Sequence, residues 1–375
     1  MTIILPKASD IQGATPIGNW GENIPVYDVH NMYALNQLVG YVKLINAGNG
    51  TVLYRGQCKL YPHLTPSILR EEQLLKERET ALISTLKNIR SDNALKKYFQ
   101  LNNSLISGWD IYENNVIEAA LQHYGATTFS VDFVDNHWTA LWFGLYKYNK
   151  ETKKYSKRRK NKDKDGSENI EFHPTEKLPT RPEISSVILS ESEIKYYTES
   201  AQKGNLNCEE LLQKVKNKKY KEEIKKWEKK YKAIEKENNR IDRTNQNHMF
   251  LFLYVAETSG ACVRGCYYGE DTYVLDLRKA LPSTFLRPCS QHGWIVKGKD
   301  ISYSFDENIA CVIRLNIELV NQLLGNGLLL TEENFFPDIS KDKGYEILLS
   351  RQMGSSLKTR YKKALPENMI PEIQR

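Results

Sequence analysis

Residues 149–245 form a long, highly charged stretch between two parts of the chain that carry helix-like and strand-like apolar patterns. From Asn207 to Arg240 the stretch contains no Gly or Pro, and its apolar residues recur in alternating steps of four and three, which is typical of an amphipathic helix. These apolar residues are Tyr220, Ile224, Trp227, Tyr231 and Ile234. A segment this charged cannot supply a large core, so we expect the core to combine pieces from both ends of the chain.

The parts on either side of the charged stretch predict one α+β domain. Helices are expected around 33–39, 71–98 and 116–124, the last of them stopped by Gly125, and strands at 51–54 and 127–133. Residues 139–148 fit a buried helix or a buried strand. Strand patterns resume at 249–257, 272–278, 294–297 and 310–317. The expected fold is therefore a central mixed β-sheet with flanking helices and a long charged, partly helical insertion.

These patterns divide the chain into five parts. We expect an N-terminal extension, a first core part, the basic and helical insertion, a second core part and a C-terminal tail, with bounds 1–29, 30–148, 149–245, 246–350 and 351–375.

Composition indicates a protein of the cytoplasm. Of the 375 residues, 40% are hydrophobic and 26% are charged, as in ordinary folded domains. The longest apolar run, Met249–Ala256, is too short to cross a bilayer, and no secretory leader is recognisable, so we expect no membrane contact. Six scattered cysteines do not make a disulfide framework. Cys262 and Cys266 form a close pair without a second pair to complete a zinc site, so we expect no metal.

The net charge of +7 is unevenly distributed. Ten Lys or Arg residues and two acids stand between Lys147 and Lys164, next to Tyr148 and Tyr155. This run is a candidate for phosphate contacts with RNA or DNA, and the alternative is a solvated loop or a disordered insertion. The candidate nucleic-acid residues are Lys153, Lys154, Lys157, Arg158, Arg159 and Lys160.

Several separated motifs resemble the FRG family, which is named for a Phe/Tyr-Arg-Gly motif. In this chain they are Leu53-Tyr54-Arg55-Gly56-Gln57 with Leu64-Thr65-Pro66-Ser67-Ile68-Leu69-Arg70, Leu121-Gln122-His123-Tyr124-Gly125-Ala126-Thr127-Thr128, Arg287-Pro288-Cys289-Ser290-Gln291-His292-Gly293, and Asn334-Phe335-Phe336-Pro337-Asp338. The Tyr54-Arg55-Gly56 motif is also similar to that of arginine-containing ADP-ribosyltransferases, in which the Arg holds the phosphates of NAD. A guanidinium suits that role because its planar fork matches phosphate oxygens in pairs, whereas the alternative is an Arg paired with a buried carboxylate or a helix carbonyl.

The resemblance implies further candidates for an NAD site in an ADP-ribosyltransferase-like fold. Tyr124 is the candidate for stacking on a nicotinamide or adenine ring, and His123 is the candidate for a ribose hydroxyl, although a His at a helix end often serves as a cap. Asp132 would orient Arg55 or His123, or simply begin a turn. The candidate cofactor-binding residues are Tyr54, Arg55, Gly56, Gln57, Gln122, His123, Tyr124, Thr128, Asp132 and His292.

Gln291 matches the position at which the transferases carry a catalytic glutamate. A neutral amide can bind a ribose hydroxyl, but it cannot act as a base and stabilises developing positive charge less. The implied catalytic set is therefore Arg55, Gln291 and Tyr124, with NAD as the substrate.

Two functions follow as expectations. The first is an enzyme that cleaves NAD and transfers ADP-ribose to a macromolecule, with RNA or DNA as candidate acceptors, acting as a toxin or an antiviral defence effector. The second is a non-catalytic module of the same family that binds nucleotides or nucleic acid. Partners expected besides NAD are a neutralising protein, as toxins have, or a helix that packs on the Tyr220–Ile234 stripe.

Overall fold

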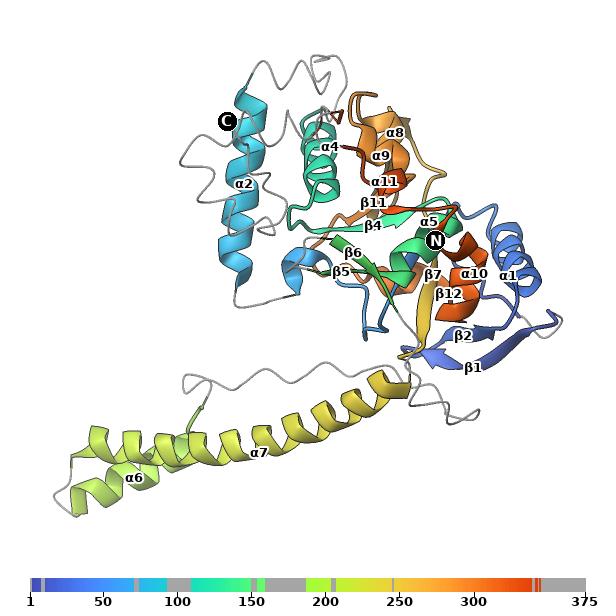
Figure 1. Cartoon of the computed structure of the whole chain (residues 1–375). Helices are drawn as coiled ribbons and strands as arrows, with labels where there is room; N and C mark the ends of the chain where they lie inside the picture. The colour runs from blue at the N-terminus through green and yellow to red at the C-terminus, as the bar shows by residue number, and fades with distance from the viewer. Residues whose placement is uncertain are drawn as a thin grey trace. The chain divides into compact units, whose positions relative to one another are not determined.

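The computed structural model describes residues 2–7, 11–70, 74–92, 109–149, 154–158, 187–203, 207–244, 246–338, 341, 342 and 344. The chain divides into two compact units, one made of residues 1–173 and 245–375 and the other of residues 174–244 (Figure 1). The first unit holds a large sheet flanked by helices, and the second holds two helices. This arrangement confirms the predicted α+β class.

The large sheet is mixed and has the strand order β1-β2-β12-β7-β3-β4-β11-β10-β9-β8. Among the described strands of this sheet, β2 and β12 alone are parallel neighbours. The strands are β1 (Ala14–Trp20), β2 (Ile24–Val29), β3 (Thr51–Gln57), β4 (Ser130–Val134), β7 (His248–Ala256), β8 (Cys262–Val263), β9 (Cys266–Tyr268), β10 (Thr272–Asp276), β11 (Gly293–Gly298) and β12 (Ile309–Asn316). The residues set apart above as an N-terminal extension thus supply two strands of the core sheet.

Helices of the first unit begin and end where the sequence provides caps. Asn31 caps the first helix by accepting from the amide of Ala34 at 2.8 Å, and Gly125, at φ +101°, ends the helix that precedes it as expected. The helices are α1 (Met32–Ile45), α2 (Leu75–Ser91), α4 (Trp109–His123), α5 (His137–Leu145), α8 (Leu277–Ala280), α9 (Leu286–Ser290), α10 (Ile317–Leu323) and α11 (Glu332–Phe335), with 3-10 turns at η2 (Ser67–Leu69), η5 (Phe305–Asn308) and η6 (Gly325–Gly327).

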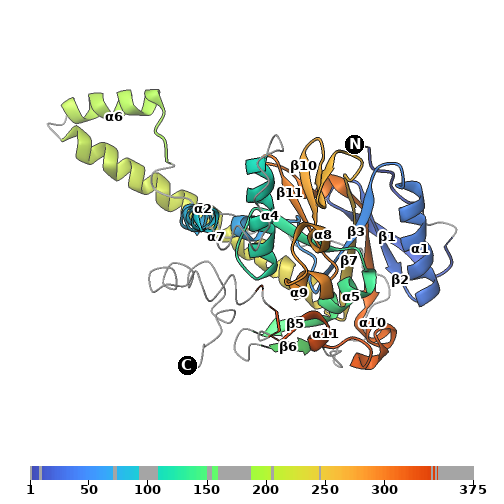
Figure 2. The same ribbon diagram turned by 90° about the horizontal axis from the view of Figure 1, so that it is seen from above.

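Both faces of the sheet are covered, as the central strand β7 shows. Its residues Met249, Leu251, Leu253 and Val255 pack in one cluster with α1, α5 and α10. The alternate residues Phe250, Phe252, Tyr254 and Ala256 pack in another cluster with Leu60, Leu64 and Phe305, which lie in loops and in η5. Figure 2 shows α1 beside β1 and β2 on the helical side of the sheet. Because β7 is buried on both faces, its sequence is a continuous apolar run rather than an alternating one.

Residues 139–148, expected as a helix or a strand, are both. The helix α5 ends at Leu145 and continues directly into β5 (Tyr146–Asn149), which pairs with β6 (Lys154–Lys157). Part of the basic run expected as a loop is therefore a strand. The side chain of Arg158, just after β6, donates to the carbonyl oxygens of His248 at 2.7 Å and Gln246 at 2.8 Å.

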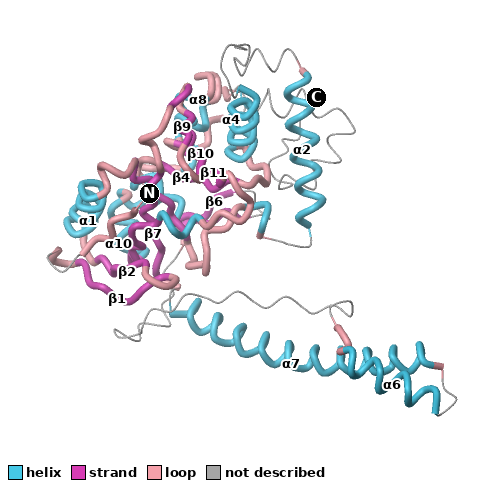
Figure 3. The backbone as a smooth tube through the Cα atoms, turned by 180° about the vertical axis from the view of Figure 1, so that it is seen from behind, coloured by secondary structure: helices cyan, strands magenta, loops and turns pink. Residues whose placement is uncertain are grey.

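The second unit consists of α6 (Glu191–Lys203) and α7 (Cys208–Thr244). Figure 3 shows α7 as one uninterrupted helix with α6 beside it. The prediction of a helix over 207–240 is confirmed, while α6 is an addition to it. Within the described residues, no helix is long and apolar enough to cross a membrane.

Candidate functional site

The three residues of the Tyr54-Arg55-Gly56 motif have different surroundings on β3. Tyr54 is fully buried in the cluster with α1 and α5, and burial raises the pKa of its hydroxyl. Gly56 lies against α5, where a Cβ atom would stand 1.7 Å from the carbonyl oxygen of Ala140. The glycine of the motif is therefore required by the close packing of a helix on the strand.

Arg55 lies where β3 and β4 stop pairing. The two strands share one registered pair, Tyr54 with Val134, so the backbone of β4 before that point lacks ladder partners on β3. Arg55 Nη1 donates to the carbonyl oxygen of Asp132 at 2.6 Å, and Gln57, with its amide oxygen turned towards the guanidinium, accepts from Arg55 Nε at 3.1 Å. Burial and the charge of Arg70 lower the pKa of Arg55 to about 10, so it stays protonated at neutral pH.

Asp132 is the carboxylate of this site. Its Oδ2 accepts from Gln122 Nε2 at 2.7 Å. Burial raises the pKa of the Asp132 carboxyl, and the positive charges of Arg55, Arg70 and Arg287 act against that rise. Three guanidinium groups thus act on the carboxyl of Asp132.

His123 and Gln122 offer unfilled hydrogen-bonding positions next to that charge. Burial lowers the pKa of His123 to about 3, so the imidazole is neutral, and the ring also bonds to the backbone of Arg287. Its Nε2 atom and the Oε1 atom of Gln122 are buried and have no partner among the described residues. The His123 ring rests on Gly293, where a Cβ atom would stand 2.7 Å from it. Buried polar atoms without partners are costly, and they mark positions that a ligand or water can fill.

Tyr124 is buried and bonded to Asp342 in the structure. Its hydroxyl donates to both carboxylate oxygens of Asp342, at 2.8 and 2.7 Å, and its side chain is 1% exposed. Asp342 also accepts from the amides of Leu286 and Arg287 at the start of α9. Arg287 lies over the rings of Tyr124 and Phe336. The stacking of Tyr124 on a base stays a prediction, and opening this ring to a ligand would require Asp342 to move.

The side chains of Gln291 and His292 have different surroundings, although the two residues are adjacent in the sequence. Gln291 is buried and its amide donates to the carbonyl oxygen of Phe335 at 2.8 Å, which joins two of the motifs quoted above. His292 is partly exposed, with φ +53°, and its Nδ1 lies 3.3 Å from Asp135 Oδ1. Asp135 is also paired with Arg278. The amide of Gln291 is therefore committed to the protein itself, while His292 belongs to an ionic cluster at the end of β4.

Thr128 links the second part of the first motif to the strand β4. Its amide donates to Ser67 Oγ at 3.1 Å, and its carbonyl accepts from the amide of Ile68 at 3.2 Å. Ser67 and Ile68 belong to η2, which the chain leaves at Arg70. The charge of Arg70 acts on both Arg55 and Asp132.

Sequence reasoning did not select Arg70, Arg287, Asp135 or Asp342 as site residues. Arg70 and Arg287 do stand in the quoted motifs, so a signal was present for these two. What the motifs could not show is that both charges act on Asp132.

The basic run is described in part. The strand β6 includes Lys154 and Lys157, and Lys157 is exposed. Arg158 is engaged with the two carbonyl oxygens named above, and burial lowers its pKa, so it has a structural role. Lys153, Arg159 and Lys160 lie outside the described residues. Nucleic-acid binding by this run stays a prediction. Among the described residues, no three His, Cys, Asp or Glu side chains are placed to hold a metal ion.

Comparison with known proteins identifies one domain of the chain. The family model of the FRG domain matches residues 50–153, and the chain therefore carries an FRG domain. This range includes β3, η2, α4, β4 and α5, and with them Arg55, Gln122, His123 and Asp132. The motifs at 287–293 and 334–338 lie outside it. No curated protein and no solved structure matches the chain.

Proposed function

We propose that this FRG-domain protein binds NAD at Arg55 and transfers its ADP-ribose to a macromolecular acceptor. The observation that supports the proposal is the set of contacts at Asp132, whose backbone carbonyl accepts from Arg55 and whose carboxyl accepts from Gln122. The two phosphates of NAD would bind beside the Arg55 guanidinium, which has no carboxylate partner among the described residues. Arg55 has two donors already in use, at Nη1 and Nε, and Nη2 remains for a phosphate oxygen.

The neighbouring polar atoms suit the sugar part of a nucleotide. Since His123 is neutral and bonds to the backbone of Arg287, its Nε2 is an acceptor for a ribose hydroxyl. Gln122 Oε1 is a second acceptor, and the same side chain fixes Asp132 through Nε2. A nucleotide would thus satisfy groups that the described residues leave unsatisfied.

In the proposed reaction the bond between C1′ of the ribose and the nicotinamide nitrogen breaks, and its electron pair leaves with nicotinamide. The acceptor oxygen or nitrogen then bonds to C1′ and releases a proton to solvent. We assign Asp132 to the stabilisation of the positive charge that develops on the ribose, because it is the carboxylate beside Arg55. Gln291 is less suited to this task, since its amide is bonded to Phe335.

Calorimetric titration of the full chain with NAD, ADP-ribose and nicotinamide tests the binding. We expect NAD and ADP-ribose to bind and nicotinamide alone to bind weakly, because the phosphates carry the recognition. Arg55→Ala should lower NAD affinity about thirtyfold to hundredfold, which corresponds to about 2–3 kcal/mol for a charged hydrogen bond. Arg55→Lys should recover little of the loss, since an ammonium lacks the planar fork.

The matched control is Arg314→Ala, which removes another half-buried arginine of the same sheet, paired with Asp28. This variant should keep the NAD affinity of the wild type. Equal NAD binding by wild type and Arg55→Ala, in folded proteins, would contradict the proposal.

Turnover is a separate measurement. NAD labelled in the adenosine part is incubated with the protein and with separate RNA, DNA and protein pools, and both nicotinamide release and label transfer are followed. Transfer to one pool identifies the acceptor class. NAD binding without nicotinamide release in any pool would assign the chain to the non-catalytic nucleotide-binding function instead.

A further inference from the structure

The long helix α7 carries a continuous row of lysines on one side. Successive residues of an α-helix are about 100° apart around its axis, so each residue from 214 to 236 can be assigned to a sector of the helix. One sector, about 80° wide, receives seven of these residues, and all seven are Lys. The members of this lysine stripe are Lys214, Lys218, Lys221, Lys225, Lys229, Lys232 and Lys236.

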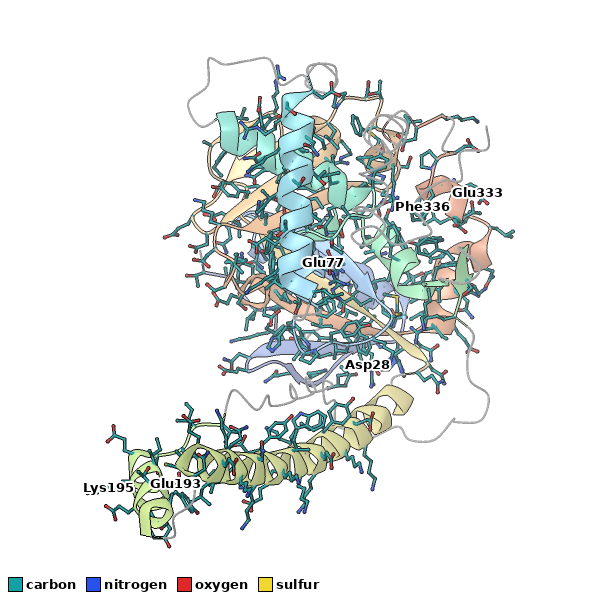
Figure 4. All side chains as sticks on the ribbon, turned by 90° about the vertical axis from the view of Figure 1, so that its left-hand side faces the viewer. Asp28, Glu77, Glu193, Lys195, Glu333 and Phe336 are labelled. Carbon is teal, nitrogen blue, oxygen red and sulfur yellow. The ribbon has the colours of Figure 1, made fainter. Side chains whose placement is uncertain are left out.

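The lysine stripe is exposed along its whole length. All seven of its side chains are exposed. The helix α6 packs on a different side of α7, where Cys208 contacts Thr198 at 3.5 Å and Lys219 contacts Glu193 at 2.6 Å. Figure 4 shows Glu193 on α6 beside this part of α7. The half-buried Tyr220–Ile234 stripe lies on a third side of the helix. Neither α6 nor the apolar side chains therefore cover the lysines.

The charge of the lysine stripe is not compensated by the described part of the chain. None of its seven lysines forms an ion pair with a described residue, whereas Lys219, outside the stripe, is paired with Glu193. Neighbours within the stripe are three or four positions apart, and like charges at these spacings repel on a helix. The row is about 33 Å long, with a rise of about 4.5–6 Å between neighbours. A row of negative charges with a similar spacing would relieve this repulsion.

The rest of α7 favours a nucleic acid over a membrane as the source of those charges. A helix that lies on a bilayer inserts its apolar side chains among the lipids. The apolar side chains of α7 are half-buried within the protein, and Trp227 is in ring contact with Tyr231 at 5.1 Å. A chain of phosphates needs the lysines alone, because phosphate contacts gain their free energy from the release of counterions.

Acidic residues on both flanks of the stripe favour a single strand over a duplex. Glu222 borders the stripe on one side, and Glu228 and Glu235 border it on the other. In the major groove of a duplex these carboxylates would face the phosphates of the groove walls, whereas a single strand can follow the lysines between them. We propose that the lysine stripe of α7 binds the phosphate backbone of single-stranded nucleic acid. Contacts to phosphates carry no sequence information, so the base sequence should matter little.

Fluorescence anisotropy tests the proposal by titrating the full chain into labelled single strands of oligouridylate and oligothymidylate, each of about 15 nucleotides. Both strands should bind. The slope of log K against log salt should be as steep as about −5, because each phosphate contact on a single strand contributes about −0.7. The measurement contains no NAD, so its outcome is independent of the function proposed above.

A pair of substitutions within the stripe has a matched pair outside it. Lys225→Gln with Lys229→Gln should make the salt slope shallower by about 1.4 and lower the affinity about tenfold to thirtyfold at about 0.1 M salt. Lys226→Gln with Lys230→Gln removes the same charge from two exposed lysines with the same spacing, and it should keep the slope of the wild type. Gln forms helices about as well as Lys, so circular dichroism should show the same helix content in both variants.

Charge-retaining substitutions complete the test. Lys225→Arg with Lys229→Arg should bind like the wild type. Equal losses in the two Gln variants would overturn the proposal, because binding would then follow net charge rather than the stripe. A wild type that does not bind single strands would overturn it too, as would tighter binding to a duplex of the same length. Binding to phosphatidylserine vesicles but not to the oligonucleotides would assign the stripe to a membrane surface instead.

Discussion

Two half-buried arginines in the same sheet, Arg314 and Arg55, have different partners. Arg314 on β12 donates through Nε and Nη2 to both carboxylate oxygens of Asp28 on the neighbouring β2, at 3.0 and 2.8 Å; Figure 4 labels Asp28. Arg55 on β3 donates to a backbone carbonyl and to a neutral amide. A bidentate carboxylate neutralises the first guanidinium, whereas the second keeps much of its charge available.

The difference teaches how to separate a structural arginine from a candidate ligand-binding one. Between β2 and β12 the ladder is continuous and the charges are matched within the sheet. Between β3 and β4 the ladder is reduced to one pair, and Arg55 donates to the backbone carbonyl of Asp132 instead of to its carboxyl group. Charge matching, rather than burial, distinguishes the two places.

The largest effect is expected at Gly56, which positions Arg55 by letting α5 pack on β3. The added methyl group of Gly56→Ala would meet the carbonyl of Ala140, a backbone atom that cannot rotate away. We expect the free energy of unfolding to fall by about 3 kcal/mol or more. Denaturant unfolding measures it. The control is Gly40→Ala on α1, where nothing lies within 4 Å of the new Cβ, and that change should be neutral or stabilising. A similar stability for both variants would contradict the packing role of Gly56.

Arg314→Ala should remove the ion pair between Arg314 and Asp28. It leaves the Asp28 carboxylate largely buried without its partner, so we expect a loss of about 2–3 kcal/mol in the free energy of unfolding. NAD affinity should stay at the wild-type level. Arg55→Ala should show the reverse pattern, with a smaller loss of stability and a large loss of affinity. If both variants lost stability and affinity together, the distinction between the two arginines would be wrong.

Lowering the pH should reduce the stability of the folded protein through His123, which lies beside the Arg55 site. Its pKa is about 3 in the folded protein and about 6.5 in an unfolded chain, so between these pH values the unfolded state binds a proton that the folded state does not. Stability should therefore fall as the pH falls through this window, by up to about 1.4 kcal/mol per pH unit from this group. His123→Gln should flatten the slope measured by urea unfolding between pH 6 and 4.

The smallest effect is expected for Gln291→Glu. The new carboxylate cannot donate to the carbonyl of Phe335, so we expect a loss of about 1–2 kcal/mol in the free energy of unfolding. Nicotinamide release should not increase, because the side chain is buried and directed to Phe335 rather than to Asp132. A clear gain in NAD cleavage by this variant would show instead that position 291 holds the catalytic acid. Gln291→Met, which also lacks a donor but carries no charge, separates the loss of the hydrogen bond from the effect of the charge.

Elements with strong local signals could be predicted from the sequence. The helix α7 follows from its periodicity, and the end of α4 follows from Gly125. The strands β1 and β2 were set apart as an extension because β1 contains Pro16 and Gly18, and because the partner of β2 is β12, far along the chain. A short strand whose partner lies that far away has little local signature. The strand β6 was not predicted, because its Lys-rich sequence is typical of a solvated loop.

The candidate site could be predicted residue by residue but not as an arrangement. Arg55, Gln122 and His123 were selected from motifs, and Asp132 was selected from the strand that follows one of them. That Arg55 binds the carbonyl rather than the carboxylate of Asp132 depends on where the β3–β4 ladder ends, which no motif states. The burial of Tyr124 against Asp342 depends likewise on a contact between residues 218 positions apart.

The hydrogen bonds of Arg158 to Gln246 and His248 affect which changes of length this chain can tolerate. The side chain of Arg158, just after β6, is bonded to Gln246 and His248, close to the point where the chain returns to the sheet-bearing unit. The closure of the intervening loop is thus set at its base, and lengthening a loop that is already closed adds little entropic cost. The segment between these points is therefore an exchangeable cassette: a chain in which a short Gly-Ser linker joins residue 158 to residue 246 should still form the ten-stranded sheet. Insertions and deletions in this segment should be tolerated during evolution, while the arginine and the strand it holds are retained.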